Sequence, residues 1–357
     1  MIDTQMKLMR MIKRSIKNMK LYKSIFTIAL IVMLSCSNEE KQTMSEYKTT
    51  GTVERIDAAL DAIIDTNAVA EIIAEGFKWS EGTLWIEKEN MLLFSDVPNN
   101  TIYKWTEAKG KEVYLTPSGY TDTIKRGGET GSNGLLLDAN GNLVLCQHGN
   151  RQMARMDAPL DQPAAKFITL ADKYQGKRLS SPNDAVYNSA GELFFTDPPY
   201  GLESQSDKDP KKEIPFNGVY KVKTNGEVIL LVDSIARPNG IAFFPGEQQI
   251  IVASSDGRNP NWFLYDVVGD SLTNGRLFYN DIASAKGQPG SPDGLKIDSK
   301  GNVFATGPGG IWIFNKEGKV LGKLKLKSPT SNCALSPDEK TLYISNHMQV
   351  LRFRMRK

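Results

Sequence analysis

Polar residues stand directly before alternating or apolar runs at six places along the chain. Each polar residue is followed by a strand-like run, a turn at Gly, Asn or Pro-Asp, and a second apolar run, as in SPNDAVYNSAGELFFTDPPYG over residues 181–201. Period-two alternation predicts half-buried strands, and the breaks predict tight turns. The polar residues that head the runs, which we call the pivot residues, are Glu81, Asn133, Asn183, Asn239, Asp293 and Asn332.

The pivot residues recur about every 40 to 55 residues, which is the repeat length of a β-propeller blade. Further strand-like runs follow in several repeats, at 218–223, 263–268 and 310–315. The sixth repeat is short, and the apolar run at 70–77 is suited to supply its fourth strand and close the ring. The pattern therefore predicts an all-β fold, a six-bladed β-propeller.

The segment before the propeller is expected to be a short helix, because Ile56, Leu60 and Ile63 in 53–64 have helical spacing. Residues 36–52 are polar and are expected to form a flexible tether. The predicted boundaries are thus 1–35 for a leader, 36–52 for the tether and 53–357 for the propeller.

The leader has seven basic residues and one acid, and the apolar run at 25–34 is too short to span a bilayer comfortably. It ends in Ser35-Cys36, which resembles a bacterial lipoprotein signal with Cys36 as the lipidated residue. We expect an exported protein whose lipid anchors it to a bacterial membrane; an uncleaved signal anchor and a plain secretory signal are the alternatives.

The net charge of +3 comes from the leader, and the rest of the chain is mildly acidic, so no electrostatic footprint for nucleic acid is present. With 30 Gly and 17 Pro, the composition suits a turn-rich β-protein. Cys146 and Cys333 lie in apolar runs and are expected to be buried free thiols; a disulfide is the alternative.

If the repeats are blades, the pivot residues meet at one mouth of the central channel. The alternative is that each pivot residue only forms a turn. That alternative accounts for Asn332, which no Gly follows, but not for Glu81, because Glu is a weak turn former. Acids buried at the channel mouth need a positively charged partner. The carboxylate and amide oxygens of the pivot residues suit Ca²⁺, with Mg²⁺, Mn²⁺ or Zn²⁺ as possible substitutes. The candidate ligands are Glu81, Asn183, Asn239, Asp293 and, less directly, Asn133.

Five motifs in order, IDAALDAIIDTNAVAEIIAEGFKWSEGTLW, GSNGLLLDANGNLVLCQHGNRQMAR, SPNDAVYNSAGELFFTDPPYGL, RPNGIAFFP and SPDGLKIDSKGNVF, resemble the gluconolactonase branch of the senescence marker protein/gluconolactonase/luciferin-regenerating enzyme family. The likeness covers roughly residues 55–350. It implies a six-bladed propeller that holds a divalent cation, usually calcium, in its central channel. It also implies an enzyme that hydrolyses a sugar lactone. It also implies that Glu81, Asn239 and Asp293 are metal ligands, that Asn183 binds metal or substrate, and that Asp293 is the general base. Spacing alone leaves Glu81 equally eligible as the base.

The expected substrate-binding residues are Asn133, His148, Asn183 and Tyr200. His148 is either a packing residue or a group at the channel mouth, and Tyr200 opens a segment, 203–213, that is either a lid or a solvated insertion. We expect a monomeric, calcium-dependent lactonase acting on a small sugar lactone. The alternatives are a non-catalytic sugar-binding propeller, another ester or lactone hydrolase, and a quinoprotein sugar dehydrogenase, which would want more cationic groups at the mouth.

Overall fold

The computed structural model describes residues 47–65, 67–280 and 282–356, with Met6, Met9 and Met11. The expected leader, Cys36 and most of the tether lie outside this description. Residues 47–357 form one compact unit, so the folded domain begins at Tyr47, before the expected boundary at 53. In the part of the chain that is described, no helix has both the length and the apolar character needed to cross a membrane.

Six antiparallel sheets of four or five strands, the blades, make up the described domain. Blade 1 contains β4 (Ser80–Ile86), β5 (Met91–Asp96), β6 (Thr101–Thr106) and β7 (Gly110–Leu115). Blade 2 contains β8 (Ser132–Leu137), β9 (Leu143–Gln147), β10 (Gln152–Met156) and β11 (Phe167–Ala171). Blade 3 contains β14 (Ala185–Tyr187), β15 (Leu193–Asp197), β16 (Gly218–Val222) and β17 (Val228–Val232).

The second half of the ring repeats this order. Blade 4 contains β18 (Pro238–Phe243), β19 (Gln249–Ser254), β20 (Asn261–Val268) and β21 (Ser271–Asn280). Blade 5 contains β22 (Leu295–Ile297), β23 (Val303–Gly307), β24 (Gly310–Phe314), β25 (Val320–Lys325) and β2 (Thr52–Arg55). Blade 6 contains β26 (Asn332–Leu335), β27 (Thr341–Asn346), β28 (Gln349–Arg354), β3 (Ala70–Glu75) and β1 (Thr49–Thr50).

Minor elements lie in the connections between strands, both within and between blades. They are the hairpin of β12 (Lys173–Tyr174) and β13 (Lys177–Arg178), the 3-10 helices η1 (Ala58–Ala62), η2 (Glu87–Glu89) and η3 (Val97–Asn99), and the helix α2 (Ile282–Ala285).

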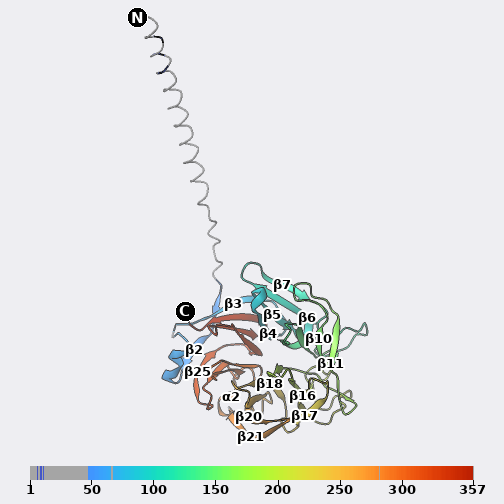
Figure 1. Cartoon of the computed structure of the whole chain (residues 1–357). Helices are drawn as coiled ribbons and strands as arrows, with labels where there is room; N and C mark the ends of the chain where they lie inside the picture. The colour runs from blue at the N-terminus through green and yellow to red at the C-terminus, as the bar shows by residue number, and fades with distance from the viewer. Residues whose placement is uncertain are drawn as a thin grey trace. The chain divides into compact units, whose positions relative to one another are not determined.

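The first strand of each blade contacts the first strand of the next, and β26 contacts β4, so these strands form a closed inner ring. Figure 1 shows β4 and β18 near the centre of the propeller, with β21 and β17 at its edge. This arrangement confirms the six-bladed propeller that the repeats predict.

The ring is closed by strands from both ends of the chain. β3 pairs with β28, so the run at 70–77 does complete the sixth blade, as predicted. β1 adds to β3, and β2 adds to β25 of blade 5. The N-terminal segment therefore covers the edges of two neighbouring blades, where open strands would otherwise remain.

The predicted helix over 53–64 is wrong. Residues 52–55 form β2, because pairing with β25 satisfies their backbone groups, and only Ala58–Ala62 form a 3-10 helix capped by the side chain of Asp57. Leu60 and Ile63 are buried as the spacing suggested, but Ile56 is 51% exposed.

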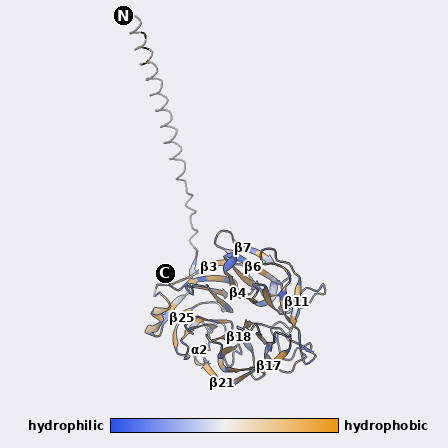
Figure 2. Ribbon diagram, in the orientation of Figure 1, coloured by the Kyte–Doolittle hydropathy of each residue, from blue (hydrophilic) through white to orange (hydrophobic). Residues whose placement is uncertain are grey.

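The core is divided into six apolar clusters, one between each pair of neighbouring blades. Trp262 of blade 4 and Trp312 of blade 5, for example, have ring centroids 6.0 Å apart. Figure 2 shows hydrophobic stretches on strands such as β11 and β17. Cys146 and Cys333 are buried free thiols, as expected. These clusters hold the inner strands, and hence the pivot residues, in a fixed ring.

Candidate functional site

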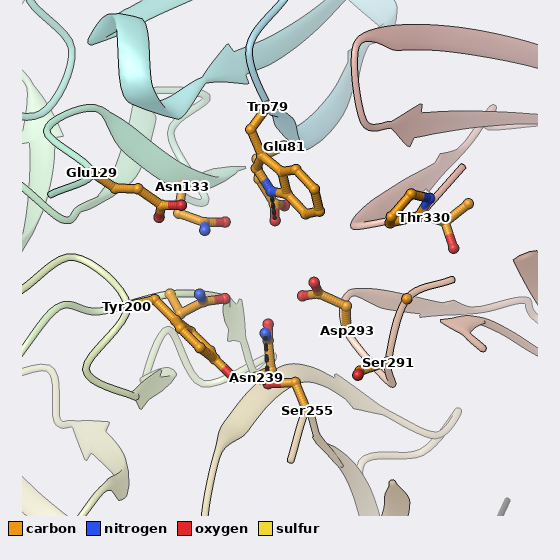
Figure 3. Close-up of a pocket in the computed structure, with 13 residues that line it drawn as sticks. Trp79, Glu81, Glu129, Asn133, Tyr200, Asn239, Ser255, Ser291, Asp293 and Thr330 are labelled. Atoms are coloured by element: carbon orange, nitrogen blue, oxygen red, sulfur yellow. Dashed lines mark hydrogen bonds between the residues drawn. The ribbon is translucent and has the colours of Figure 1, made fainter. Parts of the chain in front are cut away.

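A pocket of about 300 Å³ lies at the end of the inner ring where the pivot residues stand. Figure 3 shows side chains from several blades pointing into it. Its lining consists of Trp79, Glu81, Glu129, Asn133, Asn183, Tyr200, Asn239, Ser255, Gly290, Ser291, Asp293, Pro329 and Thr330.

The structure brings five of the six pivot residues to this pocket. Glu81, Asn133 and Asn239 are each the second residue of an inner strand, while Asn183 and Asp293 stand two residues before one. They recur at one structural position, so their polar groups converge even though they are far apart in sequence. Asn332 is buried but does not line the pocket.

Glycines directly after the pivot residues allow the inner strands to approach one another closely. A Cβ atom on Gly82 would lie 2.0 Å from the carbonyl oxygen of Asn133, and one on Gly240 would lie 2.1 Å from that of Asp293. Contacts this short exclude any side chain. The Asn-Gly and Asp-Gly pairs, which read locally as turns, here serve close packing around the channel.

Asp184 stands where glycine follows the pivot residue in blades 1, 2, 4 and 5, and its side chain packs beside Gly134. Its carboxyl is fully buried, its Oδ2 has no hydrogen-bond partner, and burial raises its pKa. The side chain of Asn332 and the charge of Lys296 both oppose the effect of burial on this pKa. Asn332 therefore supports the interior of the channel and not the pocket.

Three carboxyl groups, from Glu81, Glu129 and Asp293, face the pocket. Burial, with added repulsion from Glu129 and Asp184, raises the pKa of Glu81 to about 8. Burial and the charge of Glu81 hold the pKa of Asp293 well above its usual value. Acids in such an environment favour a proton or a metal ion as partner.

The two acids that the sequence left equally eligible as a base differ in their hydrogen bonds. Glu81 accepts from the indole Nε1 of Trp79 at 3.2 Å through Oε1, and from the backbone N–H of Gly82 at 3.2 Å through Oε2. Asp293 has a buried Oδ1 with no partner. Glu81 is thus held in place by fixed donors, whereas Asp293 keeps an open acceptor for a proton.

Unpartnered oxygens of the lining suit a hard cation. Oδ1 of Asn133, Oδ1 of Asn239 and Oδ1 of Asp293 are all buried without a hydrogen-bond partner. A cation such as Ca²⁺, which takes six to eight oxygen ligands with loose geometry, fits a donor set of carboxylate and amide oxygens. The described residues contain no group of three His, Cys, Asp or Glu side chains spaced for a metal, so the amides would be essential.

Tyr200 orients one of these amides through a serine. Its hydroxyl is 2.7 Å from Oγ of Ser255, and Nδ2 of Asn239 donates to the same Oγ at 3.3 Å. The amide nitrogen is thereby engaged, which leaves Oδ1 of Asn239 as the free atom. Tyr200 lines the pocket, as its predicted role in binding requires.

The segment after Tyr200 is docked onto the propeller. Asp207 forms an ion pair with Arg237 at 2.8 Å, and Nδ2 of Asn217 donates to both Asp207 and the carbonyl of Ala236. The guanidinium of Arg237 also lies over the ring of Tyr200. These contacts describe a fixed wall beside the pocket and not an open lid.

His148 lies outside the lining but contacts it. Its side chain is fully buried, and its Nδ1 lies 3.1 Å from Oε2 of Glu129. The ring is packed inside the protein and contacts the pocket lining through Glu129, while a role of His148 toward the substrate stays a prediction.

Several lining residues were missed in the sequence: Trp79, Glu129, Ser255, Ser291 and Thr330. Four of them lie within five residues of a pivot residue in the sequence, and the fifth, Ser255, contacts the pivot residue Asn239 from another part of the chain. For Glu129, the glycine-rich stretch RGGETGSNG at 126–134 was the available signal, because glycines next to a polar residue allow close backbone approach.

The fold and the pocket together define a six-bladed propeller with an oxygen-lined site, suited to a cation, at one end of its central channel. Residues 79–348 match the model of the SMP-30/Gluconolactonase/LRE-like region, and the chain belongs to this family.

Relatives of known name span nearly the same length. The gluconolactonase of Zymomonas mobilis is 37% identical over 313 residues, which are 86% of each chain. Regucalcin of Xenopus laevis is 22% identical and matches over 77% of this chain and 85% of its own. A solved gluconolactonase from Xanthomonas campestris superposes with a TM-score of 0.73 at 26% identity, over 87% of this chain and 98% of its own.

Proposed function

We propose that this protein is a lactonase that depends on a divalent cation, most simply Ca²⁺, and opens a sugar lactone of the gluconolactone type to its aldonic acid. The observation that carries the proposal is the set of unpartnered oxygens of Asn133, Asn239 and Asp293 in one pocket. The 37% identity to a gluconolactonase over most of the chain supports the substrate class.

The residues that would hold the ion are Glu81, Asn239 and Asp293, with Asn133 or Asn183 next to them. A bound divalent ion supplies Lewis acidity toward the lactone carbonyl and the charge that forms on its oxygen. Glu81 would act as a fixed ligand, because the N–H groups of Trp79 and Gly82 donate to its carboxylate and hold it in one orientation.

Asp293 would take a proton from the attacking water. The water oxygen bonds to the carbonyl carbon, the ring C–O bond breaks, and the proton passes to the leaving ring oxygen. The products are a hydroxyl group and a carboxylic acid on one open chain. The pocket is about 300 Å³, at the small end of ligand sites, which suits one sugar ring.

The quinoprotein alternative is disfavoured by the lining. Among the described residues, no Lys, Arg or His lines this pocket, although such an enzyme would want cationic groups there. The non-catalytic sugar-binding propeller differs from the lactonase in one feature, since a binding module needs no unpartnered acid beside a cation site.

The test is hydrolysis of glucono-1,5-lactone below the pH at which it opens spontaneously. We expect turnover that EDTA abolishes and Ca²⁺ restores. Asp293→Asn should keep an oxygen ligand yet lose on the order of 100-fold or more in rate, the usual contribution of a positioned base. Glu81→Gln should weaken cation binding and be partly rescued by excess ion, and Glu203→Gln, outside the lining, is the control. Sugar binding without cation-dependent turnover would establish the binding module.

A further inference from the structure

Glu129 is the acid of the pocket to which the proposed hydrolysis gives no role. It lies in the connection between β7 and β8, beside Asn133 and across the pocket from Asp293 in the view of Figure 3. Its side chain is 19% exposed, and the contact of Oε2 with Nδ1 of His148 is its one hydrogen bond in the described chain. An ionised carboxylate only accepts, so Nδ1 of His148 carries the proton in this pair.

The His148 ring is held rigidly behind Glu129. Its backbone N–H donates to the carbonyl of Gly131 at 3.1 Å, which ties it to the connection that bears Glu129. Gly201 packs so closely on it that an added Cβ would lie 2.5 Å from Cβ of His148. The guanidinium of Arg126 donates to the carbonyls of Gly149, which follows His148, and Gly201, which packs on it.

The carboxylate is therefore preorganised, with one oxygen engaged by His148 and the other without a hydrogen-bond partner among the described residues. We propose that Glu129 binds the hydroxyl groups of the sugar lactone, and that His148 is a positioning residue that fixes its orientation. The proposal rests on the lactonase function given above and names the residue that selects hydroxylated lactones.

The chemistry favours hydroxyl binding over proton abstraction at this position. A carboxylate that accepts a hydrogen bond from a neutral hydroxyl group makes a strong hydrogen bond. A site that contains such an acceptor binds analogues without the hydroxyl group less well, because the acceptor is then left unpaired. The contact with His148 engages one oxygen of Glu129 and leaves only the other free to accept from a substrate group. Asp293, which has an open oxygen and no such donor, is better suited to take the proton.

The test compares two lactones with the same six-membered ring, glucono-1,5-lactone and the unhydroxylated δ-valerolactone, in the full-length protein with saturating Ca²⁺. Glu129→Gln should lower kcat/KM for gluconolactone on the order of 10- to 100-fold, mainly through KM, since a hydrogen bond to a charged group is lost. Hydrolysis of δ-valerolactone should change far less, and only as far as the lost charge of Glu129 acts on Glu81 and Asp293. Glu203→Gln, an exposed acid that pairs with Lys211, is the matched control.

His148 is tested by two variants. His148→Leu removes the donor and should reproduce the selectivity loss of Glu129→Gln. His148→Asn places an amide N–H near the position of Nδ1 and should retain most of the preference. A purely structural role would instead affect both lactones and lower thermal stability with no such rescue.

An equal loss on both lactones in Glu129→Gln, or no loss on either, would overturn the proposal. If the wild-type protein hydrolyses neither lactone, the lactonase function fails, and calorimetry with gluconolactam and 2-piperidone still decides the role of Glu129. Loss of the preference for gluconolactam in Glu129→Gln supports that role, and an unchanged preference refutes it.

Discussion

The backbone of Gly82 in blade 1 lies directly against the carbonyl group of Asn133 in blade 2, so that an added Cβ would sit 2.0 Å from that oxygen. Both residues belong to the inner ring. Because Gly82 has no side chain, the pivot residue before it, Glu81, lies next to the pivot residue Asn133 of the neighbouring blade. The distance between blades at the pocket is thus set by glycine.

Gly82→Ala should destabilise the domain and disturb the pocket. Gly82 has φ of +55° as well as the close contact, so alanine adds left-handed strain to overpacking, a cost of roughly 3 kcal/mol. Gly269→Ala is the matched control, because Gly269 has φ of +56° with nothing within 4 Å, and it should cost only about 1 kcal/mol. Chemical denaturation of both variants measures the difference, and equal losses would show that the contact with Asn133 is not limiting.

The repeat of a polar residue before an apolar run was sufficient to predict the propeller, its closure by 70–77 and the convergence of Glu81, Asn239 and Asp293. These features depend on a period, and a period is visible in one sequence. The helix expected at 53–64 failed for the opposite reason. β2 exists because Val53 and its neighbours pair with β25, some 270 residues away, and local spacing cannot reveal such a partner.

Glu129 was missed for a related reason. It lies outside the repeated strand pattern, in an irregular connection. Its side chain contacts His148, whose backbone bonds to Gly131, and both contacts form only in the folded chain. Asp184 was visible beside Asn183, but its burial depends on how closely the inner strands pack around it, which the sequence does not show.

Lipidation at Cys36 remains a prediction, because Cys36 lies outside the described residues. We propose that the exported protein carries a lipid on this cysteine, which would hold the propeller at a bacterial membrane. Metabolic labelling with a palmitate analogue should mark the wild type and not Cys36→Ser. Cys146→Ser, which changes a buried thiol, is the control and should label as the wild type does. Equal labelling of Cys36→Ser would refute the anchor.

Trp79→Phe should weaken binding of the cation. The indole N–H donates to Oε1 of Glu81, and phenylalanine keeps an aromatic ring but leaves this oxygen without its donor. Loss of one such bond predicts a roughly 2- to 10-fold higher Kd for Ca²⁺ by calorimetry. Trp85→Phe removes an equivalent bond, to Glu87 at 2.7 Å, away from the pocket lining. If Trp85→Phe weakens the binding as much, the Trp79 contact has no special role.

The raised pKa values of the pocket acids predict how stability depends on pH. In the metal-free protein the pKa of Glu81 is about 8, against an ordinary value of 4.5, and that of Asp293 is raised in the same direction. Between these values the folded state binds more protons than the unfolded state. The free energy of unfolding therefore falls as pH rises through this window.

A bound cation should remove this pH dependence, because it replaces the proton as the partner of the buried carboxylates and binds only the folded state. Denaturation of the metal-free protein in EDTA at pH 5, 6, 7 and 8 should show stability falling by up to about 1.4 kcal/mol per pH unit for each carboxyl involved. With saturating Ca²⁺ the same series should be nearly flat. Glu81→Gln, which has no titrating group at that position, should show a shallower fall in EDTA. Identical slopes with and without Ca²⁺ would mean that the ion does not bind at these acids.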